Sequence, residues 1–144
     1  MIVYYLRKGT IMKKNNNLWK LIVTVVVLVA VFVLNFVGSI KSTLTDDALV
    51  VDGVFAQTSV EYKDITAVKL VDDISYGSRV GVSTFKLNSG TYTNTEYGTY
   101  TLYAYKNIGK HIVVYYGESA IMVFNCATAQ ETTDFYQLLL AKLN

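Results

Sequence analysis

The 144-residue sequence contains no proline, one cysteine and one histidine. The absence of proline excludes a proline-rich linker or polyproline ligand. Cys126 has no partner for an internal disulfide, so the fold must be stabilised by its core. Because Cys126 follows Phe124 in an apolar run, we expect a buried and inert thiol. His111 has only that one distant cysteine as a potential co-ligand, which excludes a zinc site, and we expect it at a surface or rim position.

Sequence signatures of catalysis are also missing. There is no G-x-S-x-G, P-loop or H-E-x-x-H motif, and no carboxylate pair lies in a context typical of a general acid and base. The pairs Asp46-Asp47 and Asp72-Asp73 carry oxygen ligands of the kind that calcium prefers. They lie outside any EF-hand or repeat pattern, and acidic pairs of this kind are usually turn residues. We therefore predict no catalytic residues, no cofactor and no metal site, and we do not expect an enzyme.

A long apolar run is the most prominent feature present. Residues 18–40 read LWKLIVTVVVLVAVFVLNFVGSI, and no residue from Leu21 to Ile40 is charged. Twenty helical residues rise about 30 Å, the hydrocarbon thickness of a bilayer. A buried strand is the alternative for a valine-rich run, but strands are usually about 4 to 8 residues long. We therefore predict a transmembrane helix over residues 18–40, with Trp19 and Lys20 at the membrane interface.

The distribution of charge predicts the orientation of this helix. Five basic residues and no acidic residue precede Leu21, where the uncharged part of the run begins: Arg7, Lys8, Lys13, Lys14 and Lys20. After the run, eight basic residues face eleven acidic ones. The positive-inside rule then predicts that residues 1–17 form a basic cytoplasmic tail and that residues 41–144 lie on the extracytoplasmic side of the cell membrane. The slightly acidic C-terminal region also argues against nucleic acid as a partner.

A cleaved signal peptide is the alternative to a permanent signal anchor. Val37-Gly38-Ser39 is an acceptable small-residue cleavage site. The apolar run is longer than the usual hydrophobic region of about 7 to 15 residues in a signal peptide, which favours the anchor. Separately, Met12-Lys13-Lys14 resembles a bacterial translation start, and we hypothesise that residues 1–11 are not translated.

After residue 40 the pattern changes to short alternating runs rich in valine, isoleucine, tyrosine and threonine, which is typical of antiparallel β structure. The predicted strands are 40–45, 48–52, 54–61, 66–71, 82–88, 91–95, 99–105, 111–116 and 120–125. Turns are expected at residues 46–47, 88–90, 106–109 and 117–119, and Asp52-Gly53 is typical of a type I′ hairpin. Residues 72–81 form the longest expected break.

The C-terminal residues predict a helix over 129–143. Thr128-Ala-Gln-Glu131 matches the capping box, in which the threonine hydroxyl satisfies a first-turn N–H group. Phe135, Leu138, Leu139 and Leu143 recur at helical spacing. We expect this amphipathic helix to cover the open end of the β structure.

Period-two phasing suggests which strand residues face the core. Tyr100, Leu102 and Ala104 alternate with Thr101, Tyr103 and Tyr105, and Ile112, Val114 and Tyr116 alternate with His111, Val113 and Tyr115. Assigning the aliphatic sets to the core leaves Tyr103, Tyr105 and Tyr115 exposed. If the two strands pair, these three rings form one patch suited to protein binding. The alternative is that the tyrosines simply pack in the core.

Several short motifs, taken in order, carry a resemblance to a family. They are Asp47-Ala-Leu-Val-Val-Asp-Gly53, Tyr62-Lys-Asp64-Ile65, Arg79-Val-Gly81, Tyr97-Gly98-Thr-Tyr100, and Phe124-Asn125 before the terminal helix. Residues 40–143 thereby resemble bacterial pleckstrin-homology-like (PH-like) domains of the membrane-anchored type. The resemblance implies a bent, nearly closed β-barrel of about seven strands capped by one C-terminal helix.

The resemblance does not extend to lipid recognition. Pleckstrin domains that bind phosphoinositides place lysine and arginine around the first hairpin, where this chain has Thr45-Asp46-Asp47. Because these carboxylates repel phosphate, we do not expect phosphoinositide binding. We expect a single-pass membrane protein whose PH-like domain is a non-catalytic binding or scaffolding module for another protein. The alternatives are an accessory subunit that acts through its transmembrane helix and an enzyme with an unrecognised site.

Overall fold

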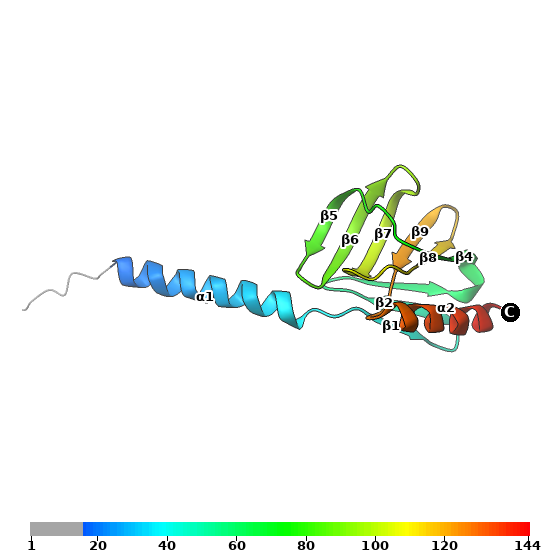
Figure 1. Cartoon of the computed structure of the whole chain (residues 1–144), viewed down its shortest axis with the longest axis horizontal. Coiled ribbons are helices and arrows are strands. Elements are labelled where there is room, and N and C mark those ends of the chain that lie inside the picture. The colour runs from blue at the N-terminus through cyan, green and yellow to red at the C-terminus, as the bar shows by residue number, and fades with distance from the viewer. Residues whose placement is uncertain (1–15) are drawn as a thin grey trace, which may run out of the picture. The chain divides into compact units, whose positions relative to one another are not determined.

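A computed structural model of the chain describes residues 16–144, apart from the side chain of Val37 (Figure 1). The hypothetical start at Met12 and most of the predicted tail, residues 1–17, lie outside the described residues. The chain divides into two compact units, of which the second runs from Leu34 to Asn144. This second unit, called the β domain below, therefore includes the last helical turn before the strands.

Helix α1 spans Asn16–Val37 and contains the apolar run. Over Asn16–Phe36 its mean hydropathy is 2.5 and none of it is buried, so it is long and apolar enough to cross a membrane. A signal sequence near the N-terminus has the same properties. The hydroxyl of Thr24 donates to the carbonyl oxygen of Lys20 at 2.8 Å, which satisfies this polar group within the helix. The helix ends three residues before the predicted end, because Ile40 is buried in the core of the β domain.

The β domain contains nine strands in two sheets, the number that the alternating pattern predicts and two more than the seven or so implied by the PH-like resemblance. The antiparallel three-stranded sheet has the order β1 (Lys41–Leu44), β2 (Ala48–Asp52) and β3 (Gln57–Glu61). The six-stranded sheet has the order β4 (Ile65–Val71), β8 (His111–Tyr116), β9 (Ala120–Phe124), β7 (Gly98–Tyr105), β6 (Leu87–Asn94) and β5 (Ser78–Ser83) (Figure 1). A 3₁₀ turn over Tyr62–Asp64 links the sheets. The predicted fold class, mainly β between an apolar N-terminal helix and a C-terminal helix, is confirmed.

Both faces of the six-stranded sheet are covered, and this decides where its side chains lie. One face packs against the three-stranded sheet and the C-terminal helix, through core residues that include Leu49, Val51, Leu87, Ile112, Phe124 and Leu139. The opposite face holds a second cluster of Tyr92, Tyr100, Leu102, Ala104, Val113 and Val123. Ile74 and Tyr76, from the segment between β4 and β5, pack against this second cluster. Alternate residues of the central strands therefore point to two different buried faces, rather than one set to a core and the other to a surface.

The predicted turn at residues 88–90 is wrong, because two strands pack closely there. Residues 88–90 lie within β6, and the turn falls at residues 84–86, where the N–H of Thr84 donates to the carbonyl oxygen of Leu87 at 2.9 Å. Gly90 pairs with Gly81 of β5, and a Cβ on either residue would collide with the facing backbone. These glycines allow two strands to approach closely rather than marking a turn or the end of a strand. The predicted break at residues 72–81 accordingly contains the start of β5 at Ser78.

The expected hairpin at Asp52-Gly53 is present, but its turn is not of type I′. β2 and β3 are joined by the four residues 53–56, closed by a bond from the N–H of Gly53 to the carbonyl oxygen of Ala56 at 2.8 Å. The residue with positive φ in this loop is Phe55 (φ 62°). A side chain on Gly53 would collide with the ring of Tyr103, so this glycine is required for packing.

Helix α2 spans Ala129–Leu143, as predicted. The N–H of Glu131 donates to the hydroxyl of Thr128 at 3.1 Å, which is the expected cap. Leu139 is fully buried, and the ring of Phe135 meets that of Phe124 edge-on at 5.7 Å. Leu138, on the predicted apolar stripe, is 60% exposed. The helix packs against β4 and β8, so it covers part of one sheet face.

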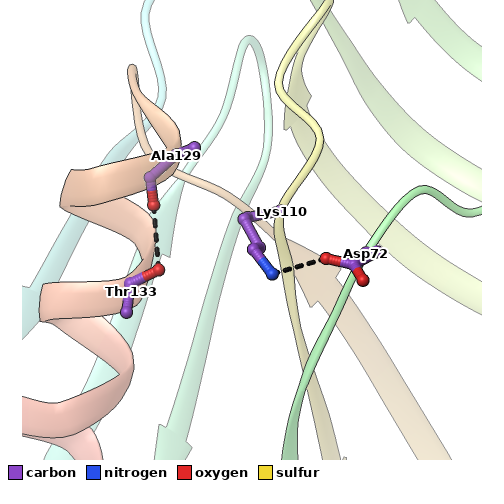
Figure 2. A network of polar contacts seen from close by, with 4 residues as sticks. All are labelled: Asp72, Lys110, Ala129 and Thr133. Carbon is purple, nitrogen blue, oxygen red and sulfur yellow. Dashed lines mark hydrogen bonds and ion pairs between the residues drawn. The ribbon is translucent and has the colours of Figure 1, made fainter.

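Polar contacts at the start of α2 and between two nearby strands add local order. Figure 2 shows the hydroxyl of Thr133 pointing back to the carbonyl oxygen of Ala129, a bond of 3.1 Å within the first turns of α2. The same view shows Lys110, just before β8, pointing to Asp72, just after β4, with which it forms an ion pair. Because this pair is largely exposed, we expect it to fix the ends of the two strands while adding little stability.

Candidate functional site

The three tyrosines predicted to form a binding patch do not lie together. Tyr103 is 1% exposed, within the core between the two sheets, and its hydroxyl lies 2.7 Å from the hydroxyl of Thr58. The predicted exposure of Tyr103 is therefore wrong. The physical reason is that the face opposite Leu102 and Ala104 is also a core face, covered by the three-stranded sheet.

Tyr105 and Tyr115 are half-buried and lie on opposite faces of the six-stranded sheet. The hydroxyl of Tyr105 accepts from the N–H of Ile40 and donates to the carbonyl oxygen of Ile40, both at 3.0 Å. The ring of Tyr115 lies 5.2 Å from the ammonium nitrogen of Lys69. Strand β9 lies between β7 and β8, which were predicted to pair. The three tyrosines therefore form no continuous patch.

A different group of aromatic side chains gathers on the face covered by residues 72–77. We call Tyr76, Tyr92, Tyr97, Tyr100 and His111 the tyrosine cluster. The hydroxyl of Tyr76 lies 2.8 Å from Nε2 of His111, and the hydroxyl of Tyr100 donates to the carbonyl oxygen of Tyr76 at 2.7 Å. Edge-on ring contacts join Tyr76 to Tyr92 and Tyr97 to Tyr100, with centroids 6.0 and 5.6 Å apart. These contacts hold the segment before β5 against the sheet.

Burial determines the protonation of the tyrosine cluster. It raises the pKa of Tyr76 to about 12, with a smaller contribution from neighbouring Tyr92. Burial also raises the pKa of Tyr97 to about 12, assisted by the charge of Glu96. His111 is 2% exposed, so the predicted surface or rim position is wrong, and burial lowers its pKa. At neutral pH the cluster therefore consists of neutral hydroxyls and a neutral imidazole.

A shallow groove of about 420 Å³ lies beside the tyrosine cluster. It is lined by Ser75, Gly77, Thr93, Asn94, Thr95 and Glu96. The side chain of Asn94 is already used, since its Nδ2 donates to the carbonyl oxygen of Ser75 at 2.8 Å and its Oδ1 accepts from the N–H of Tyr97 at 2.7 Å. The groove offers hydroxyl groups and one carboxylate, a lining suited to polar contact.

Strand β5 is an open edge of the six-stranded sheet. Among the described residues it pairs only with β6, and residues 78–81 are all exposed. Val80 is 81% exposed in the middle of the strand. An edge of this kind presents backbone N–H and C=O groups to which an extended segment can add. This site is hard to recognise in the sequence because Gly81 resembles the end of a break, although Val80 and Val82 alternate as in a strand.

The remaining polar candidates have structural roles. Within residues 16–144, no group of three or more histidine, cysteine, aspartate or glutamate side chains could hold a metal ion. Cys126 is half-buried, and burial raises the pKa of its thiol to about 11, which disfavours the reactive thiolate. In the turn between β1 and β2, the hydroxyl of Thr45 lies 3.2 Å from Oδ1 of Asp47 and accepts from the N–H of Ala48 at 3.0 Å. Asp47 therefore belongs to the hydrogen bonding of the turn.

Comparisons with models of protein families, with curated proteins and with solved structures found no match. Function must therefore be inferred from the apolar helix, the β domain and its exposed surfaces. Among these surfaces, the edge of β5 combines a strand that is paired on one side with four consecutive exposed residues, so another strand can add there.

Proposed function

We propose that this chain is a single-pass membrane protein whose extracytoplasmic β domain binds another protein without catalysing a reaction. The apolar length of α1 and the five basic residues before its hydrophobic run support the anchor and its orientation. The observation that carries the binding function is the exposed edge of β5. Its partner, in this proposal, supplies an extended segment that pairs with Ser78–Ser83.

The proposal includes the PH-like character of the β domain. Two sheets followed by one C-terminal helix are compatible with it, and the motif Asp47–Gly53 falls on and beside β2. The motif residue Asn125 is fully buried after β9, where its side-chain amide bonds both backbone groups of Tyr105, at 2.6 and 3.1 Å. A motif residue with this structural role supports a shared fold more than a shared ligand.

Strand addition accounts for binding without a deep pocket. In this mode, main-chain hydrogen bonds supply affinity, while side chains on alternate positions supply specificity. In β5 the exposed side chains available for specificity are Ser78, Arg79 and Val80. Because Val80 is highly exposed, a lysine there leaves the core unchanged and makes the edge unfavourable for pairing.

The experiment compares Val80→Lys with a matched control in intact cells. A photoreactive residue is placed at position 79, and the crosslinked protein is identified by mass spectrometry. Val80→Lys should abolish the specific crosslink, whereas Leu138→Lys, the same change at an exposed position on α2, should retain it. Both variants should melt at the temperature of the parent chain. A crosslink that survives Val80→Lys, or that is lost equally in Leu138→Lys, would contradict binding at β5.

A further inference from the structure

Two phenylalanines at loop tips are exposed in a way that folding does not explain. Phe55, between β2 and β3, is 81% exposed, and Phe85, between β5 and β6, is 78% exposed. Phe55 also has a φ of 62°, in the left-handed region that glycine and asparagine favour. An exposed ring in an unfavourable backbone conformation adds little to the stability of the fold. Such a residue indicates a contact outside the domain.

The turn that carries Phe85 is bonded to the last turn of α1. The backbone N–H of Phe85 donates to Oδ1 of Asn35 at 3.2 Å. The ammonium group of Lys86 donates to the carbonyl oxygen of Phe36 at 3.3 Å and lies 5.7 Å from the centroid of the Phe36 ring. Asn35 and Phe36 belong to the same compact unit as the strands. The end of the apolar helix and the β5–β6 turn are therefore one local structure.

The loop that carries Phe55 lies beside the last turn of α1. A cavity of about 240 Å³ is lined by Leu34, Gly38, Ser39, Gly53, Val54 and Phe55. A Cβ on Gly38 would lie 3.0 Å from Cγ2 of Val54 and 3.6 Å from Cδ2 of Leu87. Gly38 thus lets the chain leave α1 between the two hairpins. Both exposed phenylalanines lie next to the point where the apolar helix ends.

We propose that Phe55 and Phe85 insert into the interfacial zone of the lipid bilayer around the end of α1, with Lys86 at the level of the headgroups. This inference rests on the proposed membrane span. In that span α1 ends at Val37, so its last turn lies at the boundary between lipid and water. Loops that contact this turn lie at the same depth. Aromatic rings favour this zone, and a lysine beside them can reach the phosphates.

The experiment uses the full chain in phosphatidylcholine vesicles and measures tryptophan quenching by lipids brominated high on the acyl chain. Trp19 is the only tryptophan, so Trp19→Phe gives a background for single tryptophans at position 55 or 85. Glu118→Trp is the control. Position 118 lies just before β9, which runs parallel to β7 with Met122 opposite Thr101, so the start of β9 points toward the start of β7. Leu87, next to the Phe85 turn, pairs with Tyr105 at the opposite end of β7. The unmodified chain reports the depth of Trp19 itself.

We expect at least twofold quenching and a blue-shifted emission at positions 55 and 85, with neither effect at position 118. Quenching at 55 and 85 no stronger than at 118, or at only one of them, would overturn the two-loop contact. Quenching of Trp19 in the unmodified chain tests the membrane span separately from the loop insertion. Quenching of Trp19 without quenching at 55 and 85 leaves the span intact and rejects the loop insertion. If Trp19 is not quenched, the proposed span is itself rejected, and the loop insertion with it.

Discussion

Buried polar residues hold the segment before β5 in place, and among them His111 is the one whose charge depends on pH near neutrality. Its Nε2 lies 2.8 Å from the hydroxyl of Tyr76, and its Nδ1 is buried without a hydrogen-bond partner of ordinary geometry. Burial lowers the pKa of His111 below 6.5, while the Asp72 backbone and the charge of Asp73 oppose this shift. The folded state therefore favours the neutral imidazole more strongly than the unfolded state does.

Stability should consequently depend on pH through His111. Above pH 6.5, the ordinary pKa of histidine, the imidazole is neutral in both states. As the pH falls below that value the unfolded state binds the proton first, so the free energy of unfolding decreases until the folded-state pKa is reached. Denaturant unfolding of the detergent-solubilised chain between about pH 7 and pH 5 measures this slope. His111→Gln should flatten it, whereas Tyr76→Phe should retain it. Equal slopes for the parent chain and His111→Gln would contradict this assignment.

At the scale of single residues, the sequence predicted the local role of a residue more reliably than it predicted whether the residue is exposed. The cap at Thr128 depends on residues within one turn, so the capping box identified it correctly. Tyr103 was assigned to the surface because its neighbours Leu102 and Ala104 are apolar. Alternation cannot reveal that a second sheet covers the opposite face. The edge of β5 was missed because a glycine that allows close strand approach resembles a glycine that breaks a strand.

Among the elements, α2 is the one whose contribution to the free energy of unfolding can be tested most simply. Its bounds were predicted correctly, since the cap and the spacing of leucines are local signals. The buried Leu139 joins α2 to the core of both sheets, while its neighbour Leu138 is exposed. This contrast between adjacent leucines provides a matched pair for measuring how strongly α2 is held.

Leu139→Ala should lower the free energy of unfolding by about 2 to 4 kcal/mol, because it leaves a cavity at a fully buried site. Thr128→Ala should cost about 1 kcal/mol, since the N–H of Glu131 loses its acceptor. Leu138→Ala should change stability by about 0.5 kcal/mol or less. Denaturant melts of the three variants test this order. A Leu139→Ala melt indistinguishable from that of Leu138→Ala would mean that α2 does not pack on the sheets as described.

For the molecule as a whole, the length of the separable domain can be tested. Ile40 is buried, and its backbone N–H and C=O both bond the hydroxyl of Tyr105. We therefore expect residues 39–144 to fold as a β-rich monomer with a higher melting temperature than residues 41–144, the predicted domain, which lack Ile40. Circular dichroism and sedimentation measure both properties. Equal melting temperatures would show that Ile40 contributes nothing to the core.

The orientation of the chain in the membrane is the claim on which the proposed function most depends. The charge before the apolar run predicted it, and the length and hydropathy of α1 support a span. Protease added to cells stripped of their wall, with the membrane left intact, tests it directly, with an antibody against the β domain as readout. We expect the β domain to be degraded while cytoplasmic proteins are not. A domain that stays protected until the membrane is permeabilised would contradict the proposed orientation.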